Sequence, residues 1–143
     1  MQLPGFRASC LTISAMFVFL AVSFLAGGVA EGMARYQVPA ETLASPHYID
    51  AMTWVFLHMT TIGLIVGVVG VFADTARMQR AFARLMLAAQ LGYGFLDVRA
   101  ADWALGTALY KGPGSLGPVV VGALCVVLWL RLNVVAPRPP GAR

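Results

Sequence analysis

The chain has 143 residues, of which 59% are hydrophobic and only 11% are charged, with a formal net charge of +4. Soluble domains carry about a quarter charged residues, so this composition is typical of a protein whose main solvent is lipid. The length allows one domain and excludes a separate soluble enzyme module. The arginines stand at the ends of apolar runs, which excludes a basic nucleic-acid-binding segment and indicates membrane topology.

The first long apolar run covers residues 8–30, between Arg7 and Glu31. About 20 apolar residues cross a hydrocarbon core, so this run predicts a first transmembrane helix. Arg7, the apolar stretch and the small residues at 28–30 also resemble a signal peptide with its cleavage site. Because the run is longer than the apolar part of a usual signal peptide, we expect a retained helix.

Two further runs are long enough to span. Residues 51–73 are uncharged, and Ser45 followed by Pro46 predicts that this helix begins near Pro46, with the serine as its N-cap. Residues 112–130 are also uncharged, and the glycine and proline residues at 112–114 predict a turn that leads into the last helix.

The remaining candidate is short, because only residues 85–96 lie between Arg84 and Asp97. Twelve helical residues rise about 18 Å, which is less than the core thickness of about 30 Å. The loops on either side nevertheless carry opposite charge biases, so a third helix must connect them. We expect it to include residues from both flanks, over about 80–101.

Charge sets the expected orientation. The N-terminus, the second connection and the C-terminus hold seven of the ten basic residues, and the other two connections hold three, with most of the acids. Basic residues are enriched on the cytoplasmic side of membranes. We therefore expect an all-α, multi-pass protein of the inner (cytoplasmic) membrane: one four-transmembrane-helix bundle over 1–136, with spans at about 8–30, 46–73, 80–101 and 114–134, both termini inside, and a proline-rich disordered tail at 137–143.

Small residues four apart recur in the predicted helices and favour close helix packing. Cys10 and Cys125 lie in two of these helices and have no metal-ligand spacing, so we interpret them as packing residues and predict no metal site. The small-residue pairs are Ser23 with Gly27, Gly63 with Gly67, Ala88 with Gly92, and Pro118 with Gly114 and Gly122.

Polar side chains follow one face of each of the two central helices, where a membrane makes them costly. We predict that these faces enclose a polar pocket open to the extracytoplasmic side, because the two stripes reach similar depths. The candidates on the second helix are His47, Asp50, Trp54 and His58, and those on or after the third are Gln90, Tyr93, Asp97, Arg99 and Asp102.

Structural roles explain several of these residues equally well. His58 could be a hydrogen-bond donor between helices, and Asp97 with Arg99 could be an ion pair at the membrane boundary. Aromatic residues collect at both boundaries of membrane proteins. We assign Trp54, Trp103, Tyr48 and Tyr110 to an outer belt, and Trp129, beside Arg131, to the inner one.

Four functions fit the sequence, and it identifies no cofactor. An accessory subunit, or a binding protein for a lipophilic small molecule, fits a pocket with few polar groups in an apolar wall. An enzyme could use His58 and Asp97 in acid–base chemistry on a lipid-soluble substrate. A small transporter would need an oligomer. His47 and His58 cannot ligate one haem within one chain, because they lie about 16 Å apart along one helix, but a haem site shared between chains or with a larger partner stays open. The expected partners are the lipid bilayer and another protein or a second copy.

Overall fold

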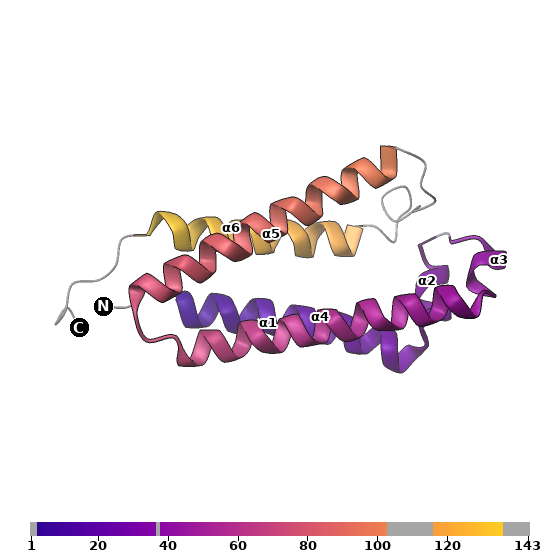
Figure 1. The fold of residues 1–143 in the computed structure, drawn as a ribbon, viewed down its shortest axis with the longest axis horizontal. Coiled ribbons are helices and arrows are strands. Elements are labelled where there is room, and N and C mark those ends of the chain that lie inside the picture. The colour runs from indigo at the N-terminus through magenta and orange to yellow at the C-terminus, as the bar shows by residue number, and fades with distance from the viewer. Residues whose placement is uncertain (1–2, 37, 103–115, 136–143) are drawn as a thin grey trace.

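The computed structural model describes residues 3–36, 38–102 and 116–135; for 96–102, 116 and 118 it describes the backbone alone. All the regular secondary structure of these residues is helical, as predicted (Figure 1). The predicted tail at 137–143, the turn before the last helix, Trp103 and Tyr110 lie outside the described residues. The helices are α1 (Phe6–Gly27), α2 (Val29–Ala34), α3 (Ala40–Leu43), α4 (Pro46–Phe72), α5 (Ala76–Asp102) and α6 (Leu116–Val134).

Most helix boundaries agree with the sequence, and one does not. α4 begins at Pro46 with Ser45 as its N-cap residue, as predicted, although the serine side chain makes no capping hydrogen bond. α5 includes residues from both flanks of its short apolar run and has 27 residues, about 40 Å of helix. The prediction for the first helix was wrong at its end, because α1 stops at Gly27 and a separate helix follows Gly28.

The long helices alternate in direction, so the start of α1 and the end of α6 lie at the same end of the molecule (Figure 1). α1 packs along α4, and α5 packs along α6. We call the end with the start of α1 the N-terminal end, and the opposite end, which carries α2 and α3, the far end. α5 rises away from α4 toward the far end.

Small residues allow the close contact between α1 and α4. A Cβ atom at Gly63 would lie 3.2 Å from the backbone oxygen of Ser14, and one at Gly67 would lie 2.7 Å from its Oγ. At Gly70 the nearest atom would be the Cβ of Cys10. Gly63 and Gly67 thus lie at a close helix contact, as predicted, whereas Gly27, of the predicted pair on α1, has no atom within 4 Å of its Cβ position.

At the N-terminal end one apolar cluster joins the long helices, with Trp129 of α6 at its centre. The Phe82 ring lies edge-on to Trp129 at 5.9 Å and to Phe6 at 6.4 Å. Trp129 has no exposed surface, so its assignment to the inner aromatic belt was wrong. Its apolar area is removed from solvent by packing between helices, which the spacing to Arg131 does not reveal.

A buried glutamine closes this end of the molecule. The backbone N–H of Leu3 donates to Gln79 Oε1 at 2.7 Å, and Gln79 Nε2 donates to the carbonyl of Ala73, also at 2.7 Å. These bonds satisfy both halves of the side-chain amide, which burial requires. They connect the segment before α1 to the junction between α4 and α5.

α1 and α4 are long and apolar enough to cross a membrane. Only 17% and 22% of the residues in their most apolar windows are buried within the molecule, whereas a core helix of a soluble protein would be mostly buried. Large side chains such as Phe19, Leu64 and Phe72 are exposed on these helices. Such a surface suits contact with lipid, so the structure supports a membrane protein with transmembrane helices.

Candidate functional site

The far end contains a hollow with polar groups, and the break between α1 and α2 shapes it. Gly28 has a φ angle of +87°, which residues with a side chain rarely adopt, and it separates α1 from α2. The chain then folds α2 back against α1. A Cβ atom at Gly32 would lie 2.5 Å from Cδ1 of Phe24, so the approach of α2 to this ring requires glycine.

Two rings of an aromatic stack, those of Phe24 and Tyr36, line the hollow. Phe24 of α1 stacks on Phe56 of α4 with ring centroids 4.4 Å apart, and on Tyr36 with centroids 5.9 Å apart. The three rings belong to an apolar cluster formed by α1, α2, α4 and the segment after α2. This cluster holds the Tyr36 ring in place, because it leaves only 8% of the residue exposed.

Tyr36 keeps its proton under ordinary conditions. Burial raises the pKa of the phenol above its usual value, and the positive charge of Arg35 lowers it by less. The neutral hydroxyl is therefore available as a hydrogen-bond donor or acceptor at the hollow.

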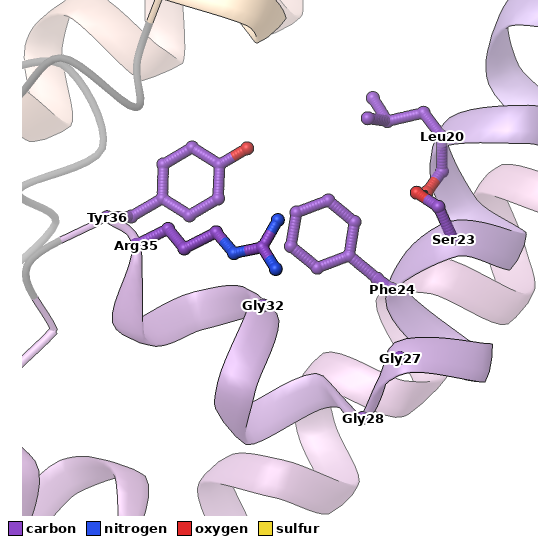
Figure 2. A pocket seen from close by; sticks show the side chains of 8 residues that line it. All are labelled: Leu20, Ser23, Phe24, Gly27, Gly28, Gly32, Arg35 and Tyr36. Atoms are coloured by element: carbon purple, nitrogen blue, oxygen red, sulfur yellow. The ribbon is translucent and has the colours of Figure 1, made fainter.

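The hollow has a volume of about 240 Å³ and combines a cation with an apolar wall. Figure 2 shows the exposed Arg35 side chain extending from the end of α2 toward the Phe24 ring. The Ser23 hydroxyl donates to the Leu20 carbonyl at 2.7 Å within α1. The lining residues are Leu20, Ser23, Phe24, Gly27, Gly28, Gly32, Arg35 and Tyr36.

This arrangement can hold an amphipathic molecule. The guanidinium of Arg35 presents a planar fork of donors that matches a carboxylate or phosphate. Leu20 and Phe24 offer apolar surface beside it. Among the described residues no group of three or more metal-ligating His, Cys, Asp or Glu side chains occurs.

The predicted stripe on α4 is exposed. Trp54 and His58 lie together, with ring centroids 6.1 Å apart, and Nδ1 of His58 lies 2.7 Å from the Trp54 carbonyl oxygen one turn earlier. His47 and Asp50 stand in the first turns of the same helix and are also exposed. The polar contact described for His58 is therefore local to α4.

The opposing stripe on α5 is directed elsewhere. Nε2 of Gln90 would lie 3.8 Å from a Cβ atom at Gly122 of α6, so Gln90 is on the side of α5 that meets α6. Tyr93 is 57% exposed. Since α4 packs on α1, the described side chains do not set His58 against Gln90 or Tyr93, and that pocket stays a prediction.

Three of the predicted pocket residues lie where the structure describes the backbone alone. Asp97, Arg99 and Asp102 belong to the last two turns of α5, where the backbone alone is described. Their roles in a pocket or an ion pair therefore stay predictions.

The hollow at Arg35 was missed by sequence reasoning. In the sequence analysis Arg35 contributes only to the charge of the connection after the first helix. The adjacent Gly27 and Gly28, followed by Gly32, are the signal that could have indicated a helix break and a close return of the chain. No family model, characterised protein or solved structure matches the chain.

Proposed function

We propose that this chain is a four-span protein of the inner (cytoplasmic) membrane, with both ends in the cytoplasm, that binds a lipophilic molecule with an anionic head. The single observation that carries the binding function is the hollow in which Arg35 stands beside the stacked Phe24 and Tyr36 rings.

The membrane part of the proposal follows from length and charge. α1 and α4 have the apolar length of transmembrane helices. The 27 residues of α5 and the 19 of α6 correspond to about 40 and 28 Å of helix, close to or above a core thickness of about 30 Å. The alternating directions of the helices suit an even number of crossings. The excess of arginine at the N-terminal end of the molecule suits a cytoplasmic location for that end.

The ligand part follows from the position of the hollow at the far end, where this orientation places the extracytoplasmic boundary. A molecule with an apolar tail reaches this depth from the lipid and can present its head to Arg35. Pockets for such ligands are mostly apolar, with few polar groups that fix orientation. Fatty-acid-like and phospholipid molecules, whose heads are a carboxylate or a phosphate, belong to this class.

Native mass spectrometry tests this proposal directly. The protein is extracted gently without added ligand, and the spectra are recorded together with an absorption spectrum that would identify a chromophore. We expect a bound molecule of defined mass on the wild type and on Arg7→Gln, which removes an exposed charge at the opposite end. We expect it to be lost from Arg35→Gln. An unchanged number of bound molecules on Arg35→Gln, or a bare wild-type chain, would refute the binding function.

A second function, that of an accessory subunit, is favoured by an apolar groove along α1. The groove has a volume of about 410 Å³ and is lined by Ala15, Val18, Phe19, Val22, Ser23 and Ala26. Small residues at such a surface let another transmembrane helix approach closely. The same spectra distinguish this function, since an accessory subunit would retain a partner chain, and Ala15→Leu would release it.

A further inference from the structure

The first turns of α5 carry three arginines on one face. Arg77, Arg80 and Arg84 are three and four residues apart, which places their side chains above one another on a helix. They line a hollow of about 510 Å³ together with Ala76 and Ala81, whose short side chains leave space between the guanidinium groups.

The three arginines are held differently. Nη2 of Arg80 donates to the carbonyl oxygen of Val135 at 3.3 Å, which anchors this side chain to the end of α6. The Nε of Arg80 is buried and has no hydrogen-bond partner within the described part of the chain. Arg77 and Arg84 are exposed and extend from α5 on either side of it. The hollow therefore has one fixed cation and two cations at its rim.

An exposed apolar stripe runs beside the arginines. Met78 and Leu85 are 58% and 65% exposed, and each directly follows one of the two rim arginines. Ala81 and Ala88 are exposed between the row of arginines and this apolar stripe. Their short side chains leave a shallow surface along α5. A cationic hollow beside an exposed apolar strip is complementary to a phospholipid, whose phosphate would lie at the arginines and whose acyl chain would lie along the strip.

We infer that this hollow binds the headgroup phosphate of an anionic phospholipid of the inner leaflet, with an acyl chain along Met78, Ala81 and Leu85. Guanidinium groups form charge-assisted, bidentate hydrogen bonds with phosphate oxygens, and the exposed Arg77 and Arg84 can present such groups to a headgroup. Basic pockets on the cytoplasmic side of transmembrane helices are suited to such headgroups. The inference rests on the proposed membrane orientation, but it is independent of any ligand at Arg35.

Lipid retention by the delipidated protein tests this site. The full chain is titrated with phosphatidylglycerol or phosphatidylcholine in detergent and examined by native mass spectrometry. The test variant is Arg77→Gln with Arg84→Gln; the matched control, Arg7→Gln with Arg131→Gln, removes two exposed charges from the same end. The loss of two basic headgroup contacts corresponds to roughly a thirtyfold loss of phosphatidylglycerol affinity. We expect that loss in the test variant and less than about a twofold change in the control.

Three results would overturn the inference. They are equal retention of the two lipids by the wild type, an equal loss in both double variants, and displacement of phosphatidylglycerol by millimolar inorganic phosphate, which would indicate a site for free phosphate. Replacing Arg77 and Arg84 by lysine keeps the charge and should retain most of the lipid binding. Circular dichroism of each variant checks that the helices are intact. Labelling that shows the loop before α5 outside the cell would also contradict the inference, because the arginine hollow would then face the outer leaflet.

Discussion

The contact between α1 and α4 can be tested by adding one methyl group at Gly70. The Cβ of Gly70→Ala would meet the Cβ of Cys10, an atom attached directly to the backbone of α1. A side-chain rotation cannot relieve this contact, so the helices must separate. Overpacking costs about 1–3 kcal/mol, and the better helix propensity of alanine offsets up to about 1 kcal/mol. We expect a net loss of about 1–2 kcal/mol in the free energy of unfolding.

The measurement is unfolding in mixed micelles, followed by circular dichroism as sodium dodecyl sulfate is added. Gly63→Ala should behave like Gly70→Ala, because its Cβ would lie 3.0 Å from Phe17 Cβ. Gly67→Ala should cost less, since its nearest atom is the Ser14 hydroxyl, which can rotate away. Gly92→Ala is the matched control, with no atom within 4 Å of its added Cβ. Equal stability of Gly70→Ala and Gly92→Ala would refute the packing described here.

Three further predictions concern single polar side chains. Because burial raises the pKa of Tyr36 above about 10, the stability due to its neutral phenol is present below that pH and is lost as the pH rises further. Arg35→Gln should raise that pKa further in ultraviolet titrations from which the Tyr36→Phe spectrum is subtracted, and an unchanged or lower pKa would contradict this. Gln79→Ala leaves two buried backbone groups without their partner and should cost about 1–3 kcal/mol, whereas Gln90→Ala should cost less in the same micelle assay. His58→Ala should leave the thermal midpoint nearly unchanged, since the polar contact described for His58 lies within α4. A large drop would instead indicate that His58 forms a hydrogen bond between helices.

Local signals in the sequence predict much of the helical structure. Ser45 and Pro46 indicate the start of α4, and the opposite charge biases around the short run at 85–96 require the helix that is seen as α5. Gly63 and Gly67 also form a packing surface as predicted. These features depend on neighbouring residues along the chain, which is why they can be deduced without knowing which helices touch.

Helix pairing was not predictable in the same way. The polar faces of α4 and α5 were predicted to reach similar depths, but α4 packs on α1 and α5 on α6, and nothing in the periodicity selects these partners. The burial of Trp129 depends on the same pairing. The hollow at Arg35 depends on the positive φ of Gly28 and on the fit of Gly32 against Phe24, which are three-dimensional features. The sequence therefore predicts the helices better than it predicts the site.

Cysteine accessibility in intact cells tests the proposed membrane orientation most directly. Cys10 and Cys125 are buried and free, so replacing both by alanine gives a background for single cysteines at Ala34, Thr75, Gly117 and Val135. With a membrane-impermeant maleimide, the account predicts labelling at Ala34→Cys and Gly117→Cys in intact cells, and at Thr75→Cys and Val135→Cys only after the membrane is disrupted. Labelling of Thr75→Cys in intact cells, or the same accessibility at all four positions, would contradict the four-span topology and remove the Arg35 hollow from the extracytoplasmic boundary.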